Sequence, residues 1–228
     1  MNLPLKYPST KHWPWSQTVH RDDSYHQSPE FFVGKEVVIT EKLDGGNTCL
    51  YDGEVYARSV QAPSHDGWMA MVRKHHAWKS ITNIGCSNHI ILYGEDLFGI
   101  HSIEYNPIKE DETFRLFAVR TLDKSKKKYD IFRRWDDVMM QSRVRNLPLI
   151  PVVFRGFFSC VEHITEFFEN EIKNGSQLGG ECEGFVMRVT NEFEAEDFAL
   201  NVCKYVRANH VQTDQHWRKN WKQCQLKK

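Results

Sequence analysis

The sequence predicts an α+β protein. Runs of β-branched and aromatic residues recur along the chain, as in residues 36–42, where Val, Val, Ile and Thr follow one another. An Asp-Gly pair at 52–53 separates two further strand-like segments, 48–51 and 54–58, which is the pattern of a two-residue hairpin. A few other segments carry apolar residues at helical spacing.

Length and composition narrow the class of protein. A chain of 228 residues with 40% hydrophobic residues and seven Trp can bury the core of one large domain. No apolar run approaches the roughly 18 residues of a membrane helix, and the start of the chain lacks a signal peptide, so we expect a cytoplasmic protein. Six scattered Cys without a Cys-x-x-Cys pair indicate neither a zinc site nor a disulfide framework.

The first half of the chain is predicted to contain an arm, strands and one helix. Residues 1–35 are rich in Pro, Ser, His and aromatic residues without periodicity, so we expect an irregular arm that lies over the domain. After the hairpin, residues 66–79 resemble a helix with Trp68, Val72 and His75 on one face. Further strands are expected at 90–93 and 115–120.

The second half is predicted to contain two helices and two strands. Ser159 and Glu162 have the spacing of a capping box, so a helix should begin there and end by Asn174-Gly175. Residues 183–189 and 199–205 resemble closing strands. The stretch 208–228 is rich in Lys and Arg and has Trp217 and Trp221 four residues apart, which predicts a basic C-terminal helix.

The feature that suggests chemistry is residues 42–47, which read KLDGGN. Lys42 leaves a strand with a carboxylate two residues later and a glycine turn behind it. A lysine amine attacks phosphate only when neutral, which requires desolvation or nearby cations. A nucleoside triphosphate would also require carboxylates to position Mg²⁺ and cations to hold phosphate. Candidates for these groups, Glu95, Glu183 and Lys204, lie at the ends or starts of later predicted strands.

In order and context, these residues resemble the motifs of the covalent nucleotidyltransferases, the family of ATP-dependent RNA and DNA ligases and mRNA capping enzymes. Residues 42–45 look like the nucleotide-attachment motif, and Thr40, Glu41 and Asn47 around it resemble the RNA ligase version. The later motifs are matched in order by residues 56–59 (YARS), 93–99 (YGEDLFG), 114–119 (FRLFAV), 183–188 (EGFVMR) and 201–207 (NVCKYVR).

The resemblance implies a role for each matched residue. Lys42 would be the nucleophile, Arg58 would contact the ribose or the RNA end, and Phe117 would stack on adenine. Glu95 would hold the ribose or metal-bound water. The implied catalytic residues are Lys42, Asp44, Glu95, Glu183 and Lys204. The implied ATP- or AMP-binding residues are Thr40, Glu41, Lys42, Gly45, Asn47, Arg58, Glu95, Phe117, Glu183 and Lys204. Magnesium or manganese would be held through water by Asp44, Glu95 and Glu183.

The resemblance spans residues 36–207 and implies a nucleotidyltransferase fold, related to ATP-grasp folds, with antiparallel sheets flanked by helices. It implies one such domain over residues 1–228, without an OB-fold. The fifth motif usually has two lysines one residue apart, whereas only Lys204 is present here, with Arg207 as a possible substitute. Residues 6–12 and 210–217 look like segments of a small RNA ligase subgroup, without an assigned role.

The implied activity is ATP-dependent RNA ligation through a lysyl-AMP intermediate, joining 3′-hydroxyl and 5′-phosphate ends, as in RNA repair. The implied partners are RNA and an RNA-binding protein in place of the OB-fold, with no membrane. Alternatives within the enzyme class are a DNA nick ligase and a guanylyltransferase. From other classes, the chain could be a non-catalytic nucleotide- or RNA-binding module, or an α/β protein in which Lys42, Glu95 and Glu183 are unrelated surface residues.

Overall fold

The computed structural model describes residues 3–17, 24–81, 88–123, 129–208 and 221–227. One of its two main sheets has five strands in the order β1-β12-β10-β2-β9. All neighbours in it are antiparallel except β1, which runs parallel to β12. The strands of this first sheet are β1 (Lys11–His12), β2 (Val37–Glu41), β9 (Val152–Gly156), β10 (Gly184–Val189) and β12 (Val202–Val206).

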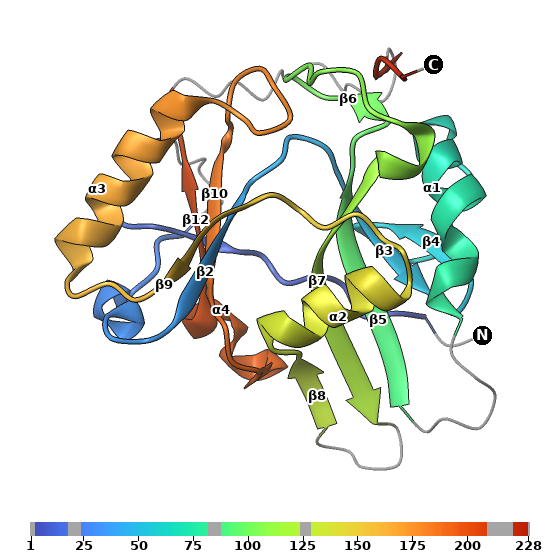
Figure 1. The fold of residues 1–228 in the computed structure, drawn as a ribbon. Coiled ribbons are helices and arrows are strands. Elements are labelled where there is room, and N and C mark those ends of the chain that lie inside the picture. Colours follow the sequence, from blue (N-terminus) through green and yellow to red (C-terminus); the bar gives the residue numbers. More distant parts are fainter. Residues whose placement is uncertain (1–2, 18–23, 82–87, 124–128, 209–220, 228) are drawn as a thin grey trace.

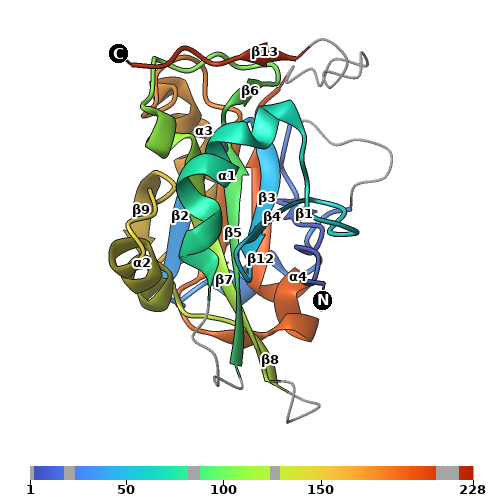
Figure 2. The same cartoon turned by 90° about the vertical axis from the view of Figure 1, so that its right-hand side faces the viewer.

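The second sheet has six strands in the order β11-β8-β7-β5-β3-β4, all antiparallel to their neighbours. Its strands are β3 (Gly46–Tyr51), β4 (Glu54–Ala57), β5 (Asn88–Asp96), β7 (Phe114–Asp123), β8 (Tyr129–Phe132) and β11 (Phe193–Glu194). A separate pair joins β6 (Gly99–Ile100) to β13 (Lys222–Gln223) and lies across one end of both sheets (Figure 2). The predicted fold class, α+β with antiparallel sheets flanked by helices, is confirmed.

Helices cover the outer sides of the sheets (Figure 1). The α-helices are α1 (Ala70–His76), α2 (Trp135–Val144), α3 (Val161–Glu171) and the single turn α4 (Phe198–Asn201). Short 3₁₀ turns are η1 (Pro29–Phe32), η2 (Gly67–Met69), η3 (Ala77–Ser80), η4 (Glu110–Glu112), η5 (Ile172–Asn174) and η6 (Ala195–Asp197). No helix among the described residues is long and apolar enough to cross a membrane.

Alternation along β10 explains how the first sheet serves both core and cavity. Successive strand side chains point to opposite faces, so Phe185 faces the core while Val186 and Arg188 line a cavity. On the core face, Phe168 of α3 stacks on Phe185 at a ring-centroid distance of 5.9 Å and on Tyr205 at 5.0 Å. Burial of these rings against α3 fixes the face of the strand that is left for the cavity.

Most predicted elements are present. The hairpin turn has Asp52 at φ 50° and Gly53 at φ 84°, the left-handed pair that a tight hairpin requires. The predicted helix 66–79 is divided into η2, α1 and η3, and its fully buried members are Val72 and His76 rather than His75. The helix predicted after Ser159 is α3, followed by η5 and by Gly175 at φ 74°.

Three details of the second half differ from the sequence prediction. Cys160 rather than Ser159 is the N-cap of α3, and the Ser159 hydroxyl lies 2.9 Å from His163 Nδ1, so the capping box is wrong. The predicted strand 199–205 begins only at Val202, because α4 occupies the preceding turn. Strand β9 and helix α2 were not predicted, since neither has a sharp apolar period in the sequence.

The predicted C-terminal helix is contradicted where the structure describes it. Residues 221–227 are extended, and β13 within them pairs with β6. Trp221 packs on Phe98 at 5.7 Å and on Trp68 at 6.4 Å, so tertiary burial of an indole replaces the helical register that the two Trp suggested. Trp217 and the segment 210–217 lie outside the described residues.

The N-terminal arm is largely irregular, as predicted, but it is built into the domain rather than laid over it. β1 extends the first sheet, and Trp13 is fully buried. The Trp13 indole donates a hydrogen bond to Thr165 Oγ1 of α3 at 3.0 Å. A buried indole with a satisfied N–H is a strong anchor for an otherwise irregular segment.

Candidate functional site

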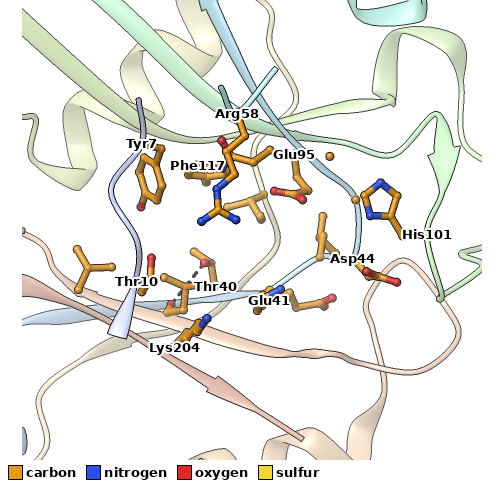
Figure 3. A pocket seen from close by; sticks show the side chains of 18 of the residues that line it. Tyr7, Thr10, Thr40, Glu41, Asp44, Arg58, Glu95, His101, Phe117 and Lys204 are labelled. Atoms are coloured by element: carbon orange, nitrogen blue, oxygen red, sulfur yellow. Dashed lines mark hydrogen bonds between the residues drawn. The ribbon is translucent and has the colours of Figure 1, made fainter. Parts of the chain in front are cut away.

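A cavity of about 390 Å³ lies between the two main sheets and collects the predicted site residues (Figure 3). Strands β2, β10 and β12 contribute one wall, and β3, β5 and β7 contribute the facing wall. Ten of the eleven predicted residues line it: Thr40, Glu41, Lys42, Asp44, Gly45, Asn47, Arg58, Glu95, Phe117 and Lys204. The remaining residue, Glu183, contacts the cavity through Lys42.

Lys42 is placed beside Glu183 by the pairing of β2 with β10. Just beyond β2, the backbone N–H of Lys42 donates to Gly184 O at 2.8 Å, which continues the ladder. Gly184 is required at this point, because a Cβ there would lie 2.0 Å from Tyr205 O. The Lys42 ammonium and the Glu183 carboxylate, which is 2% exposed, then form an ion pair.

The electrostatic balance keeps the Lys42 amine protonated. Burial alone would lower the pKa of Lys42, but the Glu183 carboxylate, and then Glu95 and Asp44, outweigh it and raise that pKa. The sequence argument expected a lowered pKa. In this ligand-free state the lysine is therefore an ammonium held by a carboxylate, and it becomes a nucleophile only after the pair separates and the proton leaves.

Asp44 fixes the backbone around the lysine turn. Its Oδ2 accepts hydrogen bonds from Ser102 N at 2.8 Å, Ser102 Oγ at 2.6 Å and Ile103 N at 2.8 Å. The N–H of Asp44 donates to the Tyr105 hydroxyl at 2.8 Å. Gly45 follows at a point where a Cβ would lie 2.5 Å from Asp96 O. Only the second oxygen of Asp44 is left free of these bonds for a metal-bound water.

Glu95 is a site carboxyl whose charged form is disfavoured by burial and by its acidic neighbours. Burial raises the pKa of Glu95 to about 8, the Lys42 ammonium opposes the shift, and Glu183, Asp44 and Asp96 reinforce it. A divalent cation would relieve this repulsion, so the residues present fit Mg²⁺ or Mn²⁺. Among the described residues, no three His, Cys, Asp or Glu side chains form a direct metal cluster. The donor set therefore suits a hydrated ion that is also held by phosphate.

The side chains of the two residues that precede Lys42, Thr40 and Glu41, bond to other parts of the protein. The Glu41 carboxylate accepts from Ser176 Oγ and from Gln177 N, both at 2.6 Å, and so anchors the 175–180 loop. The Thr40 hydroxyl donates to Val186 O at 3.4 Å. In this state the Glu41 side chain is committed to the protein, although the residue lines the cavity.

The end of the cavity away from His101 is aromatic and cationic. Phe117 on β7 and Arg58, just after β4, lie there together with Tyr7 of the arm (Figure 3). The Tyr7 and Phe117 ring centroids are 5.0 Å apart, with the planes at 73°. A flat ring beside a guanidinium group is suited to a nucleobase and its sugar.

The two basic residues of the fifth motif have different surroundings. Lys204 on β12 lines the cavity. Arg207 does not line it, and its guanidinium pairs with Glu181. Arg207 therefore does not supply a second cation to the cavity in this structure. A buried cation that does line the cavity is Arg188, whose pKa burial lowers to about 10.

Sequence reasoning missed several residues of the cavity wall that carry polar side chains. Among them are Tyr7, Thr10, His101, Ser102 and Arg188. The first two lie in residues 6–12, which the sequence analysis singled out without a role. Arg188 closes the motif at 183–188, and alternation with Phe185 placed it on the opposite face of the strand. His101 lies two residues beyond the motif at 93–99, in an irregular segment directly after β6 that has no periodic signal.

Comparisons with known proteins agree with this geometry. The model of the RNA ligase family matches residues 35–206. A mutant of a Naegleria gruberi RNA ligase with ATP and Mn has a TM-score of 0.53 at 14% identity, covering 90% of this chain and 62% of that one. An archaeal ATP-dependent RNA ligase has a TM-score of 0.52 at 11% identity, covering 89% of this chain and 48% of that one.

The family model shows the family, and the solved structures show the fold. An apo mutant of the Naegleria gruberi ligase has a TM-score of 0.50 at 15% identity and covers 80% of this chain and 52% of that one. The chain thus spans about half to three fifths of the length of the solved ligases that it matches. No curated protein matches it. Because the family model covers most of the sequence, from Lys35 to Val206, the chain belongs to the RNA ligase family.

Proposed function

We propose that this chain is the adenylyltransferase domain of an ATP-dependent RNA ligase, with Lys42 as the residue that accepts AMP. The observation that carries the proposal is that Lys42 and Glu95 line one cavity between two sheets, with Lys42 in an ion pair with the buried Glu183. The match to the RNA ligase family supports the substrate class, and the similar ligase solved with ATP and Mn supports ATP and a divalent cation.

In the first step, ATP enters with its base toward Phe117 and its phosphates toward Lys42. Entry of the phosphates separates the ion pair of Lys42 with Glu183, and Lys42 then gives its proton to water. The neutral amine attacks the α-phosphorus, the bond to the bridging oxygen breaks, and pyrophosphate leaves with that electron pair. Lys204 offsets the charge that develops on the α-phosphate. Bound Mg²⁺ or Mn²⁺ would neutralise phosphate charge near Glu95.

The lysyl-AMP phosphoramidate then supplies the two remaining steps. A 5′-phosphate of RNA attacks the AMP phosphorus and releases Lys42, which gives an adenylylated RNA end. A 3′-hydroxyl next attacks the 5′-phosphate and expels AMP, which forms the phosphodiester. The lysine converts one difficult displacement into easier ones by covalent catalysis. An RNA-binding protein or domain would present the RNA ends.

The test is strand joining with defined ends. Nicked duplexes with a labelled 5′-phosphate strand, either all RNA or all DNA, are incubated with ATP or GTP and a divalent cation. An RNA ligase yields adenylylated and joined RNA with ATP. Joining of DNA alone would indicate a nick-sealing DNA ligase, and label transfer only from GTP would indicate a guanylyltransferase. Nucleotide binding without any transfer would indicate a binding module.

A further inference from the structure

The N-terminal arm is fixed on both sides of the residues that reach the cavity. Before Tyr7 in the sequence, the Tyr93 hydroxyl donates to Leu5 O at 2.6 Å, and Arg120 Nη1 donates to Lys6 O at 3.3 Å. Arg120 is itself held by both oxygens of Asp130 at 2.6 Å. The backbone at 5–6 is therefore attached to the second sheet.

After Thr10 in the sequence, the arm is attached to the first sheet. β1 pairs with β12 in the register Lys11 to Cys203 and His12 to Lys204. The N–H of Trp13 donates to Lys204 O at 2.6 Å, next to the cavity lysine. Residues 7–10 thus bridge the two sheets. Tyr7, Pro8 and Thr10 of this bridge line the cavity, between anchors that would have to break for the segment to move away.

Tyr7 is the side chain of this bridge that determines the shape of the aromatic end. Its ring packs edge-on against Phe117 and lies 5.1 Å from the Tyr93 ring centroid. The Tyr7 hydroxyl makes no hydrogen bond to any residue that the structure describes. Burial raises the pKa of that hydroxyl, and the nearby Arg188 guanidinium opposes the shift only in part, so the group is a neutral phenol.

Thr10 lies on the same side of the cavity as Tyr7, while His101 lies at the opposite end (Figure 3). The Thr10 hydroxyl likewise makes no hydrogen bond to a described residue. A neutral hydroxyl can donate or accept, so it can match the amino group or a ring nitrogen of a purine. Tyr7 and Thr10 both line the cavity, so a ligand bound there can pair with their hydroxyls.

We propose that Tyr7, Pro8 and Thr10 form the wall that contacts the nucleobase, with Tyr7 as a specificity-determining residue whose hydroxyl bonds the adenine of the proposed substrate ATP. The inference rests on the proposed function in one respect, since it takes the ligand to be a nucleoside phosphate whose base lies against Phe117. Tyr7 acts in two ways. Its ring holds Phe117 in one plane, and its hydroxyl hydrogen-bonds an edge of the base.

The test separates these two contributions with Tyr7→Phe and Tyr7→Leu. The matched control is Tyr25→Phe, which changes a 43% exposed tyrosine of the same arm that does not line the cavity. The rate of protein adenylylation or guanylylation is measured against ATP and GTP concentration, and thermal unfolding checks each variant. Tyr7→Phe should lower kcat/KM for ATP roughly 3- to 10-fold with little change for GTP, the effect of one lost hydrogen bond.

Tyr7→Leu should weaken both nucleotides, because Phe117 loses its lateral support. Tyr25→Phe should match the wild type. A Tyr7→Phe variant that folds and keeps the wild-type ratio of ATP to GTP would overturn the inference and leave the proposed function intact. If the wild type forms no adduct with any nucleotide, the proposed function fails instead. In that case, calorimetry gives the dissociation constants of AMP and GMP for the wild type and for Tyr7→Phe. An unchanged ratio of the two constants in the variant would overturn the inference.

Discussion

Glu183 holds the amine of Lys42 in an ion pair across 141 residues of sequence, at the point where β10 begins and β2 has just ended. The pair leaves Lys42 protonated until a ligand replaces it. The ion pair therefore keeps the amine protonated and unreactive in the absence of ATP. Separation of Lys42 from Glu183 determines when the lysine loses its proton.

The variant Glu183→Gln should therefore change the pH dependence of adenylylation. Loss of the carboxylate removes the main influence that raises the pKa of Lys42, so the neutral amine forms at lower pH. The maximal rate should fall, while the rising limb of the rate profile, measured between about pH 6 and pH 10, moves to lower pH. The matched control is Glu181→Gln, whose carboxylate pairs with Arg207 away from the cavity. An unshifted limb in the Glu183 variant would argue against control of Lys42 by Glu183.

Phe117→Leu should lower the binding free energy of the nucleotide more than it lowers the free energy of unfolding. Stacking of a base on an aromatic ring contributes about 1–3 kcal/mol, so ATP affinity measured by calorimetry should fall by roughly 5- to 150-fold. The control is Phe154→Leu, a partly buried phenylalanine of β9 that packs with Phe158 and Phe167. Equal losses of affinity in the two variants would show that the effect is not local to the cavity.

Lys204→Met and Arg207→Met should differ in their effect on the first chemical step. Lys204 lines the cavity, so its loss should slow adenylylation by roughly 100-fold or more, as expected for a group that stabilises transition-state charge. Arg207 pairs with Glu181 outside the cavity, so its loss should slow that step less than tenfold on the same scale. Single-turnover rates with saturating ATP measure both. A larger loss in the Arg207 variant would restore it as the second cation of the fifth motif.

Asp96→Asn should stabilise the fold at alkaline pH. Asp96 is 2% exposed, its Oδ1 accepts from Phe98 N at 3.0 Å, and its Oδ2 has no partner among the described residues. Burial raises the pKa of Asp96 to about 8 from an ordinary value near 4. The unfolded chain ionises first as pH rises, so the wild type loses stability between these values.

Because asparagine keeps the bond from Phe98 and cannot ionise, the variant should gain roughly 1–3 kcal/mol above pH 8 and little below pH 4. Denaturant unfolding at two pH values measures the difference. A stability difference that is independent of pH would mean that Asp96 is not protonated in the folded state at neutral pH.

The sequence was informative where local chemistry dictates structure. The hairpin at 52–53, the strand before Lys42 and the helix now seen as α3 followed from turn residues and apolar periods. The grouping of Lys42, Glu95 and Glu183 followed from the family resemblance, because these residues are far apart in sequence. Sheet pairing brings them together, and no local pattern specifies that pairing.

Tertiary burial decided the parts that the sequence could not supply. Trp221 suggested a helix by its spacing, but its indole packs on Phe98 and Trp68, and the chain around it pairs with β6. Tyr7 lies in a segment without periodicity, so nothing local indicated that its ring would pack on Phe117. The charge state of Lys42 was also misjudged, because it depends on a carboxylate 141 residues away.

The most direct test is formation of a lysyl-AMP adduct by the wild type and by Lys42→Arg. The arginine keeps a cation beside Glu183 but cannot act as the nucleophile, because it stays protonated. Each protein is incubated with α-labelled ATP and Mg²⁺ or Mn²⁺, denatured, and mapped by peptide mass spectrometry. An acid-labile AMP adduct on Lys42, present in the wild type and absent from the variant, is the predicted result. A wild type that binds ATP but carries no adduct, or a variant that still carries one, would contradict the assignment of Lys42 as the nucleophile.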